Sequence, residues 1–91
     1  MVKIVINKRS GGFCLSQKAY EFLGHNWDGC GYAFNKDRTN PQLVACVETL
    51  GQEANGSMAE LKVIEIPDDV EWDIHEYDGV EWIAEKHRTW E

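Results

Sequence analysis

The sequence predicts a small α+β domain, with two helices packed on one face of a mixed or antiparallel sheet. Three observations lead to this fold class. Several short runs alternate apolar and polar residues, as strands do. Two apolar stretches begin at helix-capping residues and end at glycine. The length of 91 residues fits one domain, spanning residues 1–91.

The first half of the chain predicts a strand, a helix and a second short strand. Residues 2–7, "VKIVIN", alternate and are expected to form a strand. Ser16 is a suitable N-cap for a helix that ends at Gly24. Residues 32–35, "YAFN", are expected to form a short strand after an intervening loop.

The second half predicts a helix followed by three strands. Asn40 followed by Pro41 starts the helix, which ends at Gly51. Residues 59–67, "AELKVIEIP", form the next strand. Residues 71–77 alternate, and Asp78-Gly79 favours a type I′ hairpin turn. A helix over residues 80–87 is the alternative to a final strand.

The net charge of −7 argues against duplex nucleic acid as a partner, because phosphates would be repelled. The charge is uneven along the chain. Residues 1–20 hold four basic residues and no acid, whereas residues 68–91 hold nine acids and two basic residues. Either the two ends pair in the fold, or a local basic pocket favours a small anion over a polymer.

Composition also indicates the cellular compartment and whether a metal or cofactor is expected. No apolar run is long enough to span a membrane, and the N-terminus lacks the features of a signal peptide. The three cysteines are odd in number and form no CxxC pair, so we expect free thiols in a reducing cytoplasm. Neither a metal site nor a cofactor is expected.

A first candidate site follows the N-terminal strand. Gly11 and Gly12 allow close backbone approach, and Lys8, Arg9 and the Ser16 hydroxyl would complete a phosphate site at a helix start. The pattern is not a Walker motif. The alternative is a strand-to-helix turn that needs glycine for its dihedral angles.

A second set of candidates supplies further phosphate and base contacts. His87, Arg88 and Trp90 offer an imidazole, a planar guanidinium and a stacking surface. Arg38 would join the same pocket, and Phe13 would provide an alternative stacking ring. The alternatives are that Trp90 packs the C-terminus on the core, that Arg88 pairs with acids, and that Arg38 is a solvated loop charge.

The acidic end of the chain is a third candidate. Residues 68–85 contain eight acids, and alternate acids on a strand pair fall on one face. Such a face, with an exposed tryptophan, could imitate a phosphate backbone before a basic groove. The alternative is that the acids confer solubility and protect sheet edges.

Four stretches together resemble a family of small proteins from bacteriophage and prophage genomes. They are "KIVIN", "GGFCLS", "RTNPQLVACVETLG" and the closing segment from "AELKVIEIP" to "HRTW". The resemblance covers most of the chain. It implies a phage-encoded accessory protein in the host cytoplasm, and it implies no established activity.

These observations predict a non-enzymatic protein that counters host defence by binding. The three histidines are scattered, and no nucleophile signature is present. The preferred mechanism is sequestration of an anionic nucleotide signal by a homo-oligomer, because so small a domain cannot enclose such a ligand alone. The alternative is an acidic, anti-CRISPR-like inhibitor that blocks a nucleic-acid-processing host protein.

Overall fold

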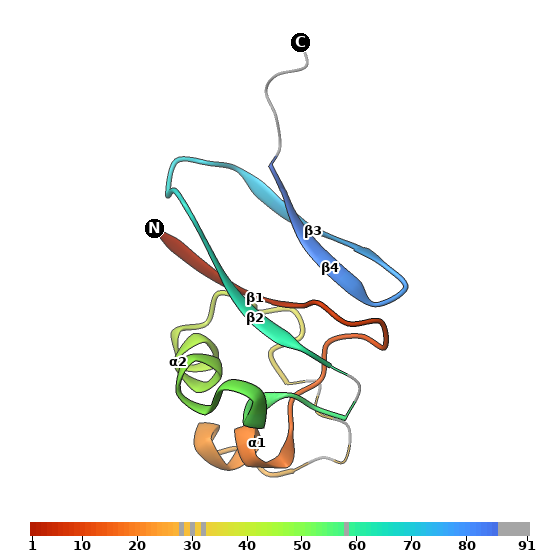
Figure 1. Ribbon diagram of the computed structural model, residues 1–91. Coiled ribbons are helices and arrows are strands. Elements are labelled where there is room, and N and C mark those ends of the chain that lie inside the picture. The colour runs from red at the N-terminus through yellow and green to blue at the C-terminus, as the bar shows by residue number, and fades with distance from the viewer. Residues whose placement is uncertain (28, 30, 32, 58, 86–91) are drawn as a thin grey trace.

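The β1–β2 ladder lies between the two helices and a separate hairpin, β3–β4 (Figure 1). The computed structural model describes residues 1–27, 29, 31, 33–57 and 59–85. Its elements are β1 (Val2–Asn7), α1 (Gln17–Leu23), α2 (Pro41–Leu50), the 3-10 turn η1 (Gly51–Ala54), β2 (Leu61–Ile66), β3 (Trp72–Tyr77) and β4 (Val80–Glu85).

Both strand pairs are antiparallel, and each forms a two-stranded sheet. The register of β1 and β2 runs from Val2 opposite Ile66 to Asn7 opposite Leu61. The hairpin pairs Tyr77 with Val80 beside its turn. The predicted α+β class is confirmed, with antiparallel ladders.

The helix ends follow the local signals in the sequence. Ser16 Oγ accepts a hydrogen bond from Ala19 N at 3.1 Å and caps α1, which ends at Gly24 with a φ of 76°. Asn40 Oδ1 accepts from Gln42 N at 2.8 Å, and Pro41 occupies the first turn of α2. Both predicted helices are confirmed. They could be predicted because the capping contacts join residues that are close in the sequence.

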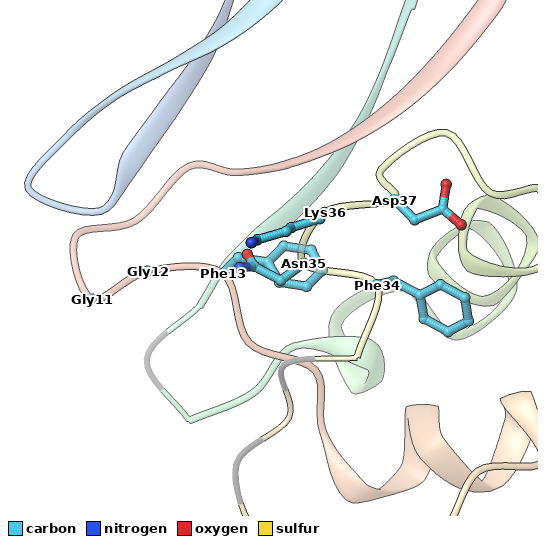
Figure 2. A pocket seen from close by; sticks show the side chains of 7 residues that line it. All are labelled: Gly11, Gly12, Phe13, Phe34, Asn35, Lys36 and Asp37. Carbon is cyan, nitrogen blue, oxygen red and sulfur yellow. The ribbon is translucent and has the colours of Figure 1, made fainter.

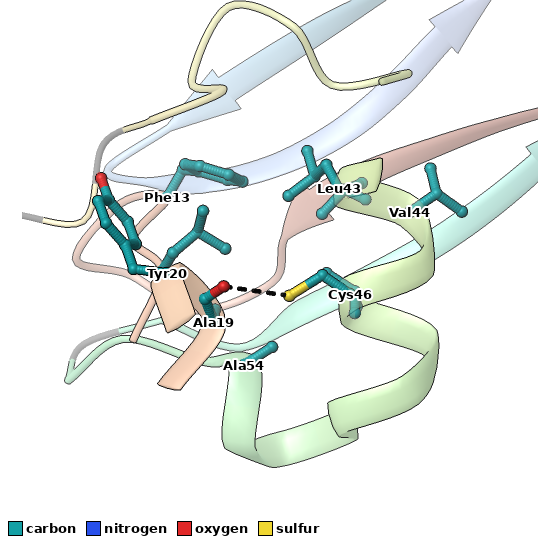
Figure 3. Close-up of a cluster of buried hydrophobic side chains, with 10 residues drawn as sticks. Phe13, Ala19, Tyr20, Leu43, Val44, Cys46 and Ala54 are labelled. Carbon is teal, nitrogen blue, oxygen red and sulfur yellow. Dashed lines mark hydrogen bonds between the residues drawn. The ribbon is translucent and has the colours of Figure 1, made fainter. Parts of the chain in front are cut away.

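The main core lies between the helices and β1. Its buried members come from both helices, β1, η1 and the segment before α1 (Figure 3). They are Val5, Phe13, Leu15, Ala19, Tyr20, Leu43, Val44, Cys46, Val47 and Ala54. The Cys46 thiol lies 3.8 Å from Ala19 O, and burial raises its pKa.

β1 is buried on both faces. Val5 belongs to the helix-side core, whereas Ile4 and Ile6 are equally buried and lie outside that cluster. Successive side chains of a strand point to opposite faces. Ile4 and Ile6 therefore face the side where β4 packs on β1. The hairpin thus covers the face of β1 that lies opposite the helices.

Residues 33–36 and 80–85 decide two of the sequence-based predictions. The predicted strand at residues 32–35 is not formed at residues 33–35, which belong to a turn that includes residue 36, and residue 32 lies outside the described part. Phe34 has a left-handed φ of 68°. Residues 80–85 form a strand, so a helix there is wrong, while residues 86 and 87 lie outside the described part.

Asp78 and Gly79 have φ values of 54° and 87°, which confirms the type I′ turn. No helix among the described residues is long and apolar enough to cross a membrane.

Candidate functional site

A buried ion pair, not a third strand, closes the outer edge of β1. Val5 N donates to Arg38 O at 2.9 Å, and Arg38 Nη1 donates back to Val5 O at 3.2 Å. Farther along the same edge, Asn7 N donates to Glu81 Oε1 at 2.8 Å. The edge groups of β1 are therefore satisfied by one loop residue and one carboxylate from β4.

The guanidinium of Arg38 is fully engaged in this arrangement. Its Nη1 and Nη2 lie 2.6 and 2.8 Å from the two carboxylate oxygens of Glu81, and both side chains are about 8% exposed. Nε donates to Asn35 O at 2.8 Å, and the guanidinium carbon lies 3.9 Å from the centre of the Phe13 ring. A phosphate could reach Arg38 only by displacing Glu81. A nucleotide base could not stack on Phe13, because the ring is buried. This geometry argues against the predicted ligand roles of Arg38 and Phe13.

The glycine turn is packed against the tip of the hairpin. A Cβ atom on Gly79 would lie 2.6 Å from Gly11 N and 2.5 Å from Gly12 N. The buried Asn7 side chain ties the two loops together, because its Nδ2 donates to Arg9 O at 2.6 Å and to Gly79 O at 2.7 Å. This close approach requires glycine at position 79, and Gly11 and Gly12 have positive φ values of 129° and 96°, which favour glycine. These contacts favour the alternative in which the glycines serve a structural connection.

Ser16 is also engaged in structure. Its hydroxyl donates to Glu53 O at 2.6 Å while it accepts from Ala19 N. It begins a helix of seven residues that starts well after the glycines. The predicted grouping of the Ser16 hydroxyl with the Gly11 and Gly12 amides is therefore not formed at this helix start.

A hollow of about 750 Å³ adjoins the turn that contains Gly11 and Gly12 (Figure 2). Gly11, Gly12 and Phe13 line it on one side. The opposite side consists of residues 34–37. Figure 2 shows Lys36 extending towards Phe13, whereas the side chains of Phe34 and Asp37 point away. Lys36 is the one cation among the described residues that line this hollow, so these residues offer little charge for a polyanion.

Lys8 and Arg9 line a different region. Arg9 borders a hollow of about 660 Å³, and Lys8 and Lys62 border one of about 440 Å³. The two hollows share Gln52, Asn55 and Glu60. Sequence analysis missed Lys62, because only the register of β1 and β2 brings it towards Lys8.

The hairpin turns a partly aromatic face to solvent. Glu81 is buried against Asn7 and Arg38, so its neighbours Val80 and Trp82 lie on the opposite face of β4. Across the ladder, Tyr77 pairs with Val80, and His75 pairs with Trp82. Tyr77 is 78% exposed and Trp82 is 43% exposed. We call His75, Tyr77, Val80 and Trp82 the outer hairpin face.

Exposed acidic residues belong to the same segment as the outer hairpin face. Residues 68–85 contain eight acids and neither lysine nor arginine. Glu81 is buried with Arg38, and the seven other acids of this segment are exposed. The hairpin segment therefore combines exposed aromatic side chains with a negative charge, a composition that the sequence indicated without showing which tryptophan is exposed.

The remaining predicted residues His87, Arg88 and Trp90 lie outside the described part of the chain. Among the described residues, no group of three or more His, Cys, Asp or Glu is arranged to hold a metal ion. No family model, curated protein or solved structure matches the chain. The resemblance to phage proteins therefore stays a prediction.

Proposed function

We propose that the protein acts without catalysis, by docking its outer hairpin face on a positively charged surface of another protein. One observation carries this proposal: Tyr77 and Trp82 are exposed on one face of a hairpin whose segment, residues 68–85, holds seven exposed acids and no lysine or arginine. Exposed aromatic side chains of this kind are typical anchors of protein interfaces.

Charge identifies the kind of partner. Exposed acids accelerate encounter with a basic surface and disfavour acidic partners. Basic grooves occur on proteins that process nucleic acids, because those grooves neutralise phosphates. The acidic hairpin would occupy such a groove in place of nucleic acid. In the setting that the phage resemblance implies, the partner is a host protein of the defence or nucleic-acid-processing machinery.

The contacts of the glycine turn favour this function over nucleotide sequestration at that turn. The groups predicted to bind a nucleotide there are engaged within the fold: Arg38 by Glu81, Ser16 by its cap, and Phe13 by the core. By contrast, Tyr77 and Trp82 do little for the described core. Side chains that face solvent without packing the core remain available for a partner.

The test measures binding to a panel of purified bacterial nucleases and polymerases with basic grooves. We expect at least one to bind, duplex DNA to compete, and Trp82→Ala to weaken the affinity by about 30-fold, the scale of an interface hot spot. Tyr77→Ala should also weaken binding. Phe22→Ala is the matched control, since Phe22 is similarly exposed on α1 and lies outside the face.

Circular dichroism would verify that each variant keeps the wild-type fold. Absence of binding across the panel would contradict the proposal. So would binding that both hairpin variants leave unchanged, or that Phe22→Ala weakens equally.

A further inference from the structure

We propose a second, independent binding site for a small phosphate-bearing anion in the two adjoining hollows beside the β1–β2 ladder. We call this region the basic hollow and define it by the side chains of Lys8, Arg9, Gln52, Asn55, Glu60 and Lys62. It shares no residue with the outer hairpin face, so each proposal can be tested without the other.

The first argument is the distribution of unpaired cations. The described part of the chain contains seven lysines and arginines. Three of these form ion pairs: Lys3 with Glu48, Lys18 with Glu53, and Arg38 with Glu81.

Of the four that form no ion pair with a described residue, three line the basic hollow, and the fourth is Lys36. The whole chain has 16 acids against 9 basic residues. In so acidic a protein, most cations should lie beside a carboxylate. Three cations that form no ion pair with a described residue thus lie together, and Glu60 is the one acid among the described residues that line this region.

Strand geometry brings two of these cations together. Lys8 N donates to Glu60 O at 2.8 Å, which extends the ladder beyond Asn7, and Lys62 lies opposite Ile6. Lys8 and Lys62 are therefore diagonal neighbours on one face of the ladder, within reach of each other's long side chains. Two like charges at this spacing repel, and an anion between them would relieve the repulsion.

The backbone of the basic hollow is held in place by a buried side chain. Asn7 is fully buried, and its Oδ1 accepts from Glu60 N at 2.8 Å and from Arg9 N at 3.3 Å. This contact fixes where Arg9 and Glu60 leave the ladder. The scaffold around the cations is therefore formed before a ligand arrives, which lowers the entropic cost of binding.

Asn55 adds a neutral donor to the hollow. Its Oδ1 accepts from Leu61 N at 2.9 Å, so the amide group keeps its two N–H donors for other contacts. Asn55 lines both hollows. Amide and cationic donors together are the groups that bind phosphate oxygens.

Size and composition indicate the class of ligand. Volumes of about 660 and 440 Å³ suit a phosphorylated metabolite. Arginine binds phosphate as a planar fork, and lysines add point charges. No aromatic side chain lines either hollow among the described residues, so base stacking is not offered. Recognition would centre on the phosphate, and a polyphosphate would engage the three cations best.

The test follows backbone amide chemical shifts by NMR while the protein is titrated with pyrophosphate, inorganic phosphate, ATP and adenosine. We expect pyrophosphate and ATP to shift the amides around residues 8–9, 52–56 and 60–62, and adenosine to shift none of them. Arg9→Ala and Lys62→Ala should each weaken pyrophosphate binding by about tenfold, because each removes a charge-assisted contact.

Lys36→Ala is the matched control, since it removes the same charge from the hollow beside Gly11 and Gly12 and should leave the affinity unchanged. Trp82→Ala should bind pyrophosphate as the wild type does. The proposal is overturned if pyrophosphate causes no shifts at about 1 mM. Equal weakening by Lys36→Ala would also overturn it, because the binding would then reflect net charge alone.

Discussion

The two faces of β1 are covered in different ways. On the helix side, Val5 packs in an apolar core to which α1, α2 and η1 contribute. On the other side lies the β3–β4 hairpin, anchored by the buried polar side chains of Asn7, Arg38 and Glu81. Apolar packing tolerates small adjustments, whereas a buried charge needs its partner in place. The buried polar side chains therefore fix the position of the hairpin. Removal of one of them should lower the free energy of unfolding by a large amount.

The buried polar side chains of the described part of the chain are all hydrogen-bonded. Every buried side-chain nitrogen or oxygen there has a hydrogen-bond partner. Removal of one member of the network leaves the others buried without a partner, which costs more than the net contribution of the bond. The following substitutions probe the two sides of β1, from the largest expected effect to the smallest.

Glu81→Ala should cause the largest loss of stability. It leaves the Arg38 guanidinium buried without its carboxylate, and it also removes the acceptor of Asn7 N. Breaking a buried pair in this way costs about 3–5 kcal/mol. Chemical denaturation measures the loss. Glu48→Ala is the control, because it breaks the exposed pair with Lys3 and should leave stability nearly unchanged.

Leu43→Ala tests the apolar side. Leu43 is fully buried in the helix-side core, and truncation should cost about 3 kcal/mol in the free energy of unfolding. The amide spectrum of the hairpin should stay close to the wild type, because no polar contact to β4 is lost. A larger spectral change in β3–β4 than in α2 would contradict the separation of the two sides.

Gly79→Ala tests the close packing of the hairpin tip. Its Cβ would fall 2.5 Å from Gly12 N, and Gly79 already has a left-handed φ. We expect a loss of about 2 kcal/mol by denaturation, from the clash and the backbone strain together. Gly24→Ala has a similar φ with open space around the new Cβ, so it should cost about 1 kcal/mol. Equal losses for the two variants would show that the tip is not tightly packed.

The smallest effect concerns the Cys46 thiol. Burial raises its pKa above the value in the unfolded chain. Stability is therefore complete below the unfolded pKa of about 8.5 and declines as the pH rises towards the folded pKa. Denaturation at pH 8 and pH 10 would measure the decline, and Cys46→Ala should reduce it. An identical decline in both proteins would assign it to other groups.

The parts of the fold that were predicted depend on neighbours in the sequence. Ser16 and Asn40 cap helices through contacts two or three residues away, and Asp78-Gly79 forms its turn locally. The turn at residues 33–36 was missed because "YAFN" has strand propensity, whereas in the fold the free edge of β1 is occupied by Arg38. Tertiary contacts override propensity in such segments.

The candidate sites were less predictable for the same reason. Arg38 and Glu81 are 43 residues apart, and nothing in their local sequence pairs them. Lys62 joins Lys8 only through the strand register. The acidic and aromatic character of residues 68–85 was visible in the sequence, but the burial of Glu81 and the exposure of Trp82 were not. Composition thus indicated which groups were available, and only the fold determined which of them face solvent.

Hydrogen exchange at the edge of β1 tests most directly whether a buried ion pair takes the place of a third strand. The amides of Val5 and Asn7 should be strongly protected, because Arg38 O and Glu81 Oε1 accept from them. The amides of Val63 and Glu65, which lie opposite Val5 and Lys3 and point away from β1, should exchange much faster. Glu81→Gln should lower the protection of Asn7 more than that of Ile4. Fast exchange of Val5 and Asn7 in the wild-type protein would contradict this account of how the hairpin is held.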